Sequence, residues 1–276
     1  MKVLLPNFWK CAGLVLVVTQ DIITNEILMV AFTREPQYLE TLQSGCAIYF
    51  SRSRWKRWKK GEESGDFQIV RQVLISCDGA TIIYQVEQKG EGACHTKAKS
   101  CFYRDCFGNF IMSAPKMGWK ENLLTAEKTV APSFMLCKTA KILMPNFSRN
   151  FGLVDVIVQN FATGQIVEAN ATDRLGYFRT LETGIAAYVY LAQHERWAKE
   201  MSDSNIQVVR QILIDCDGDA LVYGVDCKNA DACHNGSKNS FYRTFSNQHI
   251  LPVPLCAENL SITETEVVKR LVKKPG

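Results

Sequence analysis

The sequence predicts a strand-rich α+β fold made of two homologous modules, residues 1–137 and 138–276. Three observations support this prediction. Long segments of the chain recur at a fixed distance, which indicates an internal duplication. Apolar residues in each copy are spaced as in short strands. One segment of each copy also carries the start and stop signals of a short helix.

The repeat is visible by direct comparison. The segment KVLLPNFWKCAGLV from Lys2 returns as KILMPNFSRNFGLV from Lys141, a shift of 139 residues. FQIVRQVLISCDG from Phe67 returns as IQVVRQILIDCDG from Ile206 at the same shift. The register continues through the Phe-Tyr-Arg triplets at 102–104 and 241–243. We therefore place the module boundary near residue 137.

Each module begins with a predicted hairpin. In the first module the apolar runs are Leu14–Thr19 and Ile27–Phe32, and in the second they are Leu153–Val158 and Ile166–Ala169. Both pairs are rich in β-branched residues and are separated by polar turn residues. The two modules are therefore expected to start with the same supersecondary unit.

A short helix is predicted after each hairpin. Pro36–Gln43 precedes Gly45, and Asp173–Glu182 precedes Gly184. Proline is favoured in the first helical turn, and glycine is favoured just after the last turn. Thr172 or Asp173 supplies the oxygen acceptor that caps the second helix.

Composition indicates a globular protein, and its charge is compatible with an anionic small molecule without deciding for one. The chain has 276 residues, 47 % of them hydrophobic and 22 % charged, with a net charge of +4 and a pI near 8.4. This charge is below the strongly basic balance of nucleic-acid-binding proteins. The sequence contains no apolar stretch of the roughly 20 residues that a membrane helix needs. We expect neither a nucleic acid nor a membrane as partner.

The cysteines point to a reducing compartment. Eleven cysteines at uneven spacing do not suggest a closed disulfide framework, so thiols kept for metal in the cytoplasm fit better. The N-terminal run Ala12–Val18 is not interpreted as a signal peptide. Pro6 and Lys10 interrupt the apolar region, and the same segment returns inside the chain.

A cysteine-rich pattern in the first module suggests a zinc site. The module contains Cys77, Cys94 and Cys101, and His95 directly follows the second of these thiols. Three thiolates bind Zn²⁺ and leave a fourth position open for water, as a catalytic zinc requires. The alternative is that buried cysteines act as small hydrophobic residues. The combination of three thiols with an adjacent histidine favours the metal.

An acidic turn in the second module suggests a magnesium site. The predicted strands Val208–Ile214 and Ala220–Val225 flank Asp217–Gly218, a dipeptide favoured in tight hairpin turns. Within Asp215–Asp219, three carboxylates alternate around Cys216. Carboxylate oxygens are suitable Mg²⁺ ligands. A solvated acidic hairpin is the alternative.

Basic and aromatic residues alternate in SRSRWKRWKKGEESGD, residues Ser51–Asp66. Such a run is compatible with nucleic-acid binding, although a solvated strand edge is the commoner explanation. The cations, backbone amides and hydroxyls of this segment are instead of the kind that hold a phosphate and a ribose.

Three motifs occur in order: SRSR with WxKGExSG, then DCDxD, then ACHTxxxSCF. The first and third are intact in the first module, at 51–65 and 93–102, and the second is intact in the second module, at 215–219. Together they resemble the phosphoribosyl-AMP cyclohydrolase family over about 100 residues of each module. The resemblance implies a Zn²⁺- and Mg²⁺-dependent hydrolase of histidine biosynthesis, which opens the adenine ring of 1-(5-phosphoribosyl)-AMP between N1 and C6.

Neither copy matches the family pattern alone. The first module has Ser76–Cys77–Asp78–Gly79–Ala80 in place of DCDxD, so its own magnesium site is expected to be impaired. The second module has Ser240 in place of the third cysteine, and residues 197–204 lack the WxKGExSG motif. The losses in the two modules are complementary.

The family forms intertwined homodimers with shared active sites. The resemblance therefore implies that the two modules form an intramolecular pseudo-dimer, expected to be a monomer, with one complete composite site and one vestigial site. The implied zinc ligands are Cys94, Cys101 and Cys216. The implied magnesium ligands are Asp215, Asp217 and Asp219.

The resemblance also assigns roles within this site. Zinc would lower the pKa of the attacking water, and His95 would move its proton. A structural role for His95 as a hydrogen-bond donor remains the alternative. The residues implied to bind substrate are Arg54, Trp58, Lys60, Gly61, Glu62 and Ser64. Two other functions stay open: a non-catalytic regulatory pseudoenzyme, and a related hydrolase of another purine nucleotide.

Overall fold

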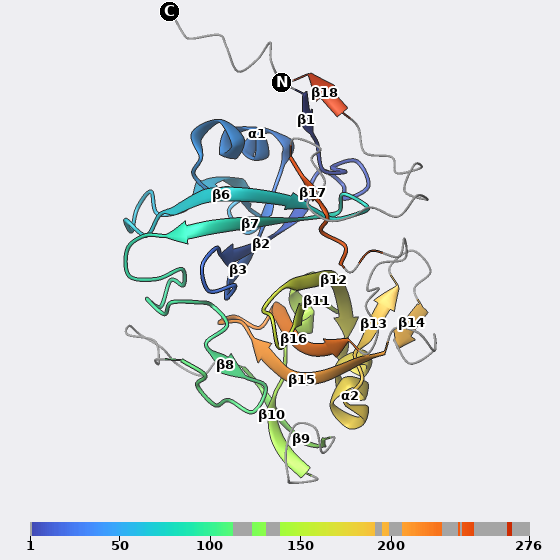
Figure 1. Ribbon diagram of the computed structural model, residues 1–276. Helices are drawn as coiled ribbons and strands as arrows, with labels where there is room; N and C mark the ends of the chain where they lie inside the picture. Colours follow the sequence, from blue (N-terminus) through green and yellow to red (C-terminus); the bar gives the residue numbers. More distant parts are fainter. Residues whose placement is uncertain are drawn as a thin grey trace, which may run out of the picture. The chain divides into compact units, whose positions relative to one another are not determined.

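The computed structural model describes residues 2–112, 123–130, 139–190, 195–198, 206–227, 237, 239–245 and 264–266 (Figure 1). The chain forms two compact units. Unit 1 comprises residues 1–92 and 233–276, and unit 2 comprises residues 93–232. Each unit therefore contains chain from both sequence repeats.

Unit 1 is centred on a five-stranded sheet with the order β17-β6-β7-β2-β3. Its strands are β2 (Val15–Asp21), β3 (Ile27–Thr33), β6 (Gln68–Ile75), β7 (Thr81–Gln88) and β17 (Arg243–Thr244). The predicted β2–β3 hairpin is present and antiparallel. The sequence did not predict the parallel pairing of β2 with β7.

Unit 2 contains the corresponding sheet in the order β12-β11-β16-β15-β8. Its strands are β8 (Arg104–Asp105), β11 (Leu153–Asn160), β12 (Ile166–Asp173), β15 (Gln207–Ile214) and β16 (Ala220–Cys227). The predicted β11–β12 hairpin and the antiparallel β15–β16 pair around the Asp217–Gly218 turn are both confirmed. Again the first strand, β11, pairs in parallel with β16.

Both predicted helices are present. Helix α1 (Glu35–Ser44) and helix α2 (Arg174–Thr183) each end at a glycine in the left-handed region, Gly45 and Gly184. Asp173 caps α2 by accepting a hydrogen bond from the Gly176 amide at 2.8 Å. A 3₁₀ turn, η1 (Phe147–Asn150), precedes β11.

Four two-stranded pairs complete the described structure. They are β4 (Ile48–Ser51) with β5 (Lys56–Lys59), β13 (Ala187–Tyr190) with β14 (Glu195–Ala198), β9 (Thr125–Thr129) with β10 (Thr139–Leu143), and β1 (Lys2–Leu4) with β18 (Glu264–Glu266). The β4–β5 hairpin carries the basic and aromatic run of the sequence.

The two repeats exchange their C-terminal segments. Strand β8 of the first repeat pairs with β15 of the second, and β17 of the second repeat pairs with β6 of the first. Likewise β9 pairs with β10, and β18 pairs with β1. Because of this exchange, residues 93–105 of the first repeat lie in the same unit as the acidic turn of the second.

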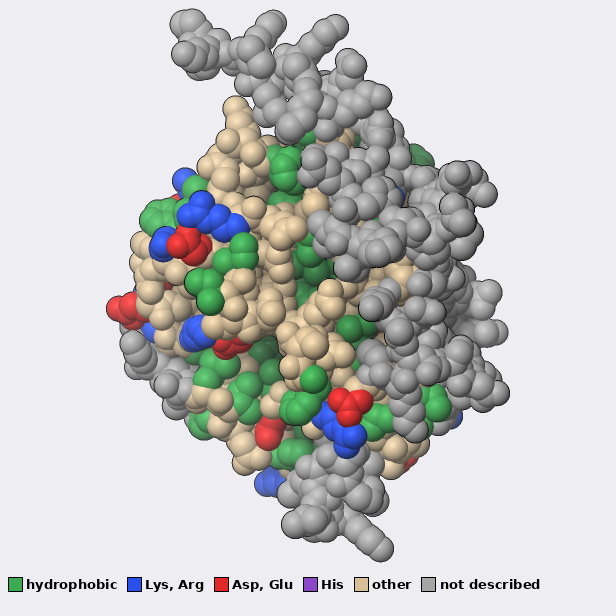
Figure 2. Space-filling model, viewed as in Figure 1, with side chains coloured by type: hydrophobic (Ala, Val, Ile, Leu, Met, Phe, Trp, Pro, Cys, Tyr) green, Lys and Arg blue, Asp and Glu red, His purple; other side chains and the backbone are tan. Residues whose placement is uncertain are grey.

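Alternate residues of β11 face the core of unit 2. Val154, Val156 and Val158 are buried there with Tyr177 and Tyr223. No helix in the described part of the chain is long and apolar enough to cross a membrane. On the face shown in Figure 2, acidic and basic side chains lie in small mixed groups rather than in one field of a single sign.

Candidate metal centre and substrate loop

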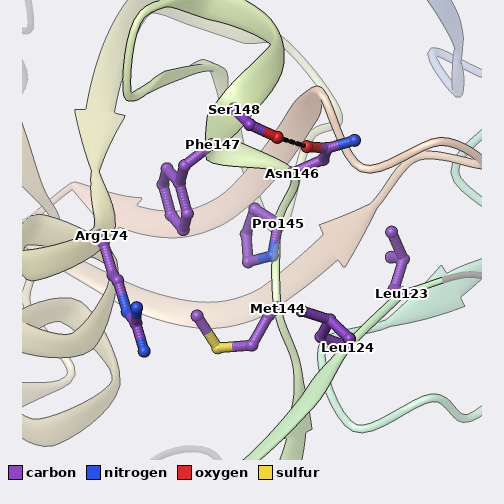
Figure 3. Close-up of a pocket in the computed structure, with 8 residues that line it drawn as sticks. All are labelled: Leu123, Leu124, Met144, Pro145, Asn146, Phe147, Ser148 and Arg174. Atoms are coloured by element: carbon purple, nitrogen blue, oxygen red, sulfur yellow. Dashed lines mark hydrogen bonds between the residues drawn. The ribbon is translucent and has the colours of Figure 1, made fainter.

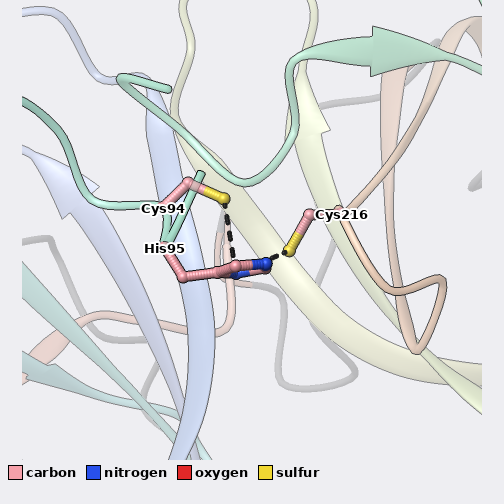
Figure 4. A group of neighbouring side chains, drawn as sticks. All are labelled: Cys94, His95 and Cys216. Carbon is pink, nitrogen blue, oxygen red and sulfur yellow. Dashed lines mark hydrogen bonds between the residues drawn. The ribbon is translucent and has the colours of Figure 1, made fainter. Parts of the chain in front are cut away.

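Side chains from two segments that are distant in sequence meet in unit 2. The ligand atoms of Cys94, His95 and Cys216 all lie within 4.8 Å of one another (Figure 4). His95 Nδ1 is 3.8 Å from the sulfur of Cys94 and 3.8 Å from that of Cys216. Cys94 and His95 lie in the loop after β7, and Cys216 lies in the turn between β15 and β16.

Cys101 completes a group of three thiols. It packs with Cys216 against the small cluster formed by Cys94, Ala98 and Tyr103. The Thr96 hydroxyl donates a hydrogen bond to the Cys94 sulfur at 3.1 Å. The structure thus brings His95 together with the three cysteines that the family resemblance implies as zinc ligands. Cys77, the remaining thiol of the first-module pattern, lies in unit 1 and is not part of this group.

The three thiols are electrostatically coupled. The neighbouring thiols of Cys101 and Cys216 lower the pKa of Cys94 by hydrogen bonding to its thiolate. The same interactions, together with burial, raise the pKa of Cys101 well above its usual range. One thiolate is therefore stabilised by two protonated partners. A soft cation that replaced those protons would satisfy all three sulfurs, so the donor set fits zinc.

The acidic turn adjoins this cluster through Cys216. Asp215 is buried and accepts a hydrogen bond from the Ala220 amide at 3.1 Å. Burial, followed by the neighbouring carboxylate of Asp217, raises the pKa of Asp215 well above its usual range. Burial opposes ionisation of Asp217, but its pKa is lowered by the hydrogen bond with Asp215 and by the Arg149 guanidinium.

Arg149, on η1, forms ion pairs with the acidic turn. Its guanidinium contacts the carboxylate of Asp217 and lies 3.5 Å from that of Asp219. The carboxylates fit a hard cation such as Mg²⁺, but Arg149 competes for two of them. No sequence motif marks Arg149, so its role becomes visible only in the folded chain.

Arg104 holds the backbone of the acidic turn in place. Its side chain is fully buried, and its Nη2 donates to the carbonyl oxygens of Asp215 and Cys216, each at 3.3 Å. The guanidinium thus fixes the backbone of the turn that carries one thiol and three carboxylates. In the sequence, the only signal for this residue is the recurrence of the Phe-Tyr-Arg triplet in both repeats.

Unit 1 keeps the same turn with different side chains. Arg243 Nη2 donates to the carbonyl oxygens of Ser76, at 3.3 Å, and Cys77, at 2.5 Å. Lys10 forms an ion pair with Asp78 at 2.8 Å, which corresponds to the pair between Arg149 and Asp217 in unit 2. The backbone support is therefore retained, although two carboxylates are missing. Cys233 and His234 lie outside the described residues.

The predicted substrate loop lies in unit 1. Gly61 has φ +86°, and a Cβ there would lie 2.6 Å from the backbone carbon of Asp66, so only glycine allows this close approach. Lys60 is buried, with its ammonium 5.8 Å from the centroid of the Trp58 ring. Trp58 packs against Tyr49 at 5.5 Å.

The remaining predicted substrate-binding residues are accessible. Arg54 is exposed and donates to the Ser51 hydroxyl at 3.3 Å. Glu62 forms an ion pair with Arg57 at 3.4 Å. The exposed Ser64 hydroxyl accepts a hydrogen bond from the Asp66 amide at 3.2 Å. The corresponding loop of the second repeat, residues 199–205, lies outside the described residues.

A pocket of about 370 Å³ is shown in Figure 3, and two of its lining residues, Leu123 and Asn146, lie next to Gly218 of the acidic turn. Leu123, Asn146 and Arg174 contribute to its lining. The Asn146 amide donates to the Gly218 carbonyl at 2.8 Å, so this wall supports the turn. Its lining residues include no thiol, carboxylate or imidazole, so the reactive side chains lie instead in the cluster of Cys94, His95 and Cys216 and in the acidic turn beside it.

The fold and site define a doubled α+β protein whose reactive groups are thiols, an imidazole and carboxylates. The family model described as phosphoribosyl-AMP cyclohydrolase matches the chain twice, at residues 29–103 and 171–242. These two matches together cover just over half of the chain. They fall on the two sequence repeats, as a duplication of the family module predicts.

Several curated relatives carry the same name. A "Phosphoribosyl-AMP cyclohydrolase" from Desulforapulum autotrophicum is 50 % identical over 98 residues, 36 % of this chain and 78 % of the relative. One from Methanoregula boonei is 49 % identical over 105 residues, 38 % of this chain and 85 % of the relative. The "Histidine biosynthesis bifunctional protein HisIE" of Aquifex aeolicus is 47 % identical over 99 residues, 36 % of this chain but only 48 % of that protein. The chain belongs to the phosphoribosyl-AMP cyclohydrolase family of enzymes.

Proposed function

We propose that the chain hydrolyses 1-(5-phosphoribosyl)-AMP, opening the adenine ring between N1 and C6, at a single composite site in histidine biosynthesis. One observation carries this proposal. The intact cysteine–histidine segment of the first repeat and the intact acidic turn of the second lie in the same unit, with His95 Nδ1 3.8 Å from the Cys216 sulfur. The complementary losses in the two repeats therefore leave one complete set of groups.

The thiols of Cys94, Cys101 and Cys216 are the proposed zinc ligands. Bound zinc would act as a Lewis acid and lower the pKa of a bound water molecule to near neutrality. The chain itself contributes the orientation of the ligands. The Thr96 hydroxyl holds the Cys94 sulfur, and Arg104 holds the carbonyl of Cys216. These contacts limit the motion of two of the three thiols before any metal binds.

His95 is the proposed proton carrier. Its ring is exposed while its Nδ1 faces the sulfurs of Cys94 and Cys216, so it reaches both the reactive cluster and solvent. An imidazole in that position takes a proton from the attacking water and delivers it to a ring nitrogen of the substrate.

The carboxylates of Asp215, Asp217 and Asp219 are the proposed magnesium ligands. A hard cation held there would neutralise charge on a substrate phosphate or polarise the purine ring. Arg149 already supplies positive charge at this position, so magnesium must displace its guanidinium from Asp217 and Asp219.

The substrate loop, including Arg54, Lys60 and Ser64, is proposed to hold the anionic ends of the nucleotide. The exchange of C-terminal segments between repeats supports an intramolecular pseudo-dimer resembling an intertwined homodimer. Such a chain already combines two modules, and we propose that it acts as a monomer. Thiolate ligands require a reducing environment, which fits the cytoplasm.

The direct test is turnover of 1-(5-phosphoribosyl)-AMP by the purified full-length chain supplied with Zn²⁺ and Mg²⁺, followed by the absorbance change of ring opening. Turnover supports the proposal. If the folded, zinc-containing chain shows no turnover, the proposal is wrong. A parallel panel of other purine nucleotides then distinguishes a hydrolase with a changed substrate from a regulatory pseudoenzyme.

A further inference from the structure

Arg34 occupies the N-cap position of α1 without capping the helix. Its side chain makes no capping hydrogen bond, whereas Asp173 at the same position of the second repeat caps α2. Aspartate is among the best N-cap residues, and arginine is not. The first repeat therefore lacks a local stabilising interaction that the second has at this position, which suggests that the arginine serves another purpose.

The Arg34 guanidinium instead packs against two aromatic rings. It is 4.1 Å from the centroid of the Phe50 ring and 4.5 Å from that of Trp55. The two rings meet edge to face at 5.3 Å. Arg34 Nε is buried and has no hydrogen-bond partner in the part of the chain that the structure describes. The stack orients the guanidinium while leaving hydrogen-bonding capacity unused.

Trp55 also has an unusual backbone conformation and an unusual exposure. It has φ +51°, in the left-handed region that bulky side chains rarely adopt, and its indole is 65 % exposed. Neither the backbone conformation nor hydrophobic burial favours tryptophan here. Strained residues of this kind concentrate at ligand-binding sites.

The stack is restricted to one repeat. At a shift of 139 residues, Arg34, Phe50 and Trp55 correspond to Asp173, Val189 and His194. The repeat with the stack is also the one that keeps the SRSR and WxKGExSG motifs. Trp55 directly follows Arg54 of that motif, and Arg54 pairs with no carboxylate in the described structure. A purine nucleotide would meet an aromatic face and two guanidinium groups here.

We propose that Arg34 and Trp55 form a nucleotide-binding element beside the motif residues. The indole of Trp55 stacks on a purine base, and the Arg34 guanidinium donates hydrogen bonds to a phosphate of the same nucleotide. This inference rests on the proposed function, which makes a purine nucleotide the substrate. It adds two residues to the predicted substrate-binding set.

The test uses substitutions that improve local structure while removing the binding groups. Arg34→Asp restores the cap present in the second repeat, and Trp55→Gly relieves the positive φ. We expect each variant to keep or raise the melting temperature. Each should weaken AMP binding about tenfold in isothermal titration calorimetry, and raise KM for 1-(5-phosphoribosyl)-AMP more than it lowers kcat.

The matched control is Asp173→Arg in the second repeat. It should lower the melting temperature by removing a cap and leave AMP affinity unchanged. Lower melting temperatures for Arg34→Asp and Trp55→Gly with unchanged AMP affinity would show that the stack is structural and overturn the inference. Absence of AMP binding to the unsubstituted chain would also overturn it. If that chain binds AMP through these residues but has no turnover, the proposed function fails while the nucleotide-binding element stands.

Discussion

Arg149 forms an ion pair with Asp217, the central carboxylate of the acidic turn. Lys10 forms the corresponding pair with Asp78 in the other unit, at 2.8 Å. Both repeats thus place a cation on the same turn position. Only the second repeat surrounds it with two further carboxylates, Asp215 and Asp219, so only there does the cation compete with a divalent metal ion.

Replacing Arg149 with methionine should increase the affinity for Mg²⁺ by about tenfold, equivalent to about 1.4 kcal/mol. The variant keeps the aliphatic stem but no longer occupies the carboxylates of Asp217 and Asp219. Isothermal titration calorimetry with Mg²⁺ measures the change. Lys10→Met is the matched control and should leave the affinity as it is. A weaker affinity in Arg149→Met would contradict competition and indicate that Arg149 helps to organise the site.

Asp217→Asn should reduce turnover of 1-(5-phosphoribosyl)-AMP by at least about a hundredfold. Loss of a group that merely supports a metal ligand typically costs about 10- to 100-fold, and loss of a ligand should cost no less. Steady-state kinetics of the two matched variants measures the effect. Asp78→Asn alters the equivalent residue of the other repeat, whose turn lacks two of the carboxylates, and should leave turnover unchanged. Equal losses in both variants would refute the single composite site.

Cys101→Ser should remove most of the zinc from the purified chain. We expect about one zinc per chain before substitution and a small fraction afterwards, because serine does not replace a soft thiolate ligand. Inductively coupled plasma mass spectrometry measures the content. Cys77→Ser, at the turn of unit 1, serves as the control and should retain zinc. Zinc loss from the control alone would place the metal at the other turn.

Arg104→Gln and Arg243→Gln should have similar effects on stability but different effects on zinc. Each arginine is buried and donates to two carbonyl oxygens of a turn, so each loss should cost about 2–4 kcal/mol of unfolding free energy. Only Arg104 supports the backbone of Cys216. We therefore expect a 10- to 100-fold loss of zinc affinity in Arg104→Gln alone.

Urea unfolding and competition with a chelator measure the two quantities separately. If Arg104→Gln loses stability while its zinc affinity matches that of Arg243→Gln, Arg104 contributes to folding and not to the orientation of the ligands.

Much of the local structure was predictable because its signals lie between near neighbours. The β2–β3 and β11–β12 hairpins follow from apolar runs separated by turn residues. Gly45 and Gly184 mark the ends of the helices, since both adopt the left-handed conformation that terminates a helix. The residue types at positions 34 and 173 likewise show that Asp173 can cap a helix and Arg34 cannot, but they do not show which groups the Arg34 side chain contacts.

The sequence by itself determined the duplication, the short elements of each copy and the chemical types of the candidate ligands. These depend on residue identity and on spacing within a few turns of chain. It also established that each copy lacks part of the family pattern. The binding of zinc and magnesium by these residues stays a prediction.

Only the tertiary structure decided which distant segments meet. The parallel pairing of β11 with β16 and the attachment of β8 to β15 bring residues 93–105 to the turn that carries Cys216. Such pairings join strands that are far apart along the chain, and no local preference specifies them. They are selected by the burial of apolar side chains and the satisfaction of backbone hydrogen bonds in the complete fold. The approach of Arg149 to Asp217 is decided in the same way, because 68 residues separate the two and only the folded chain places them in contact.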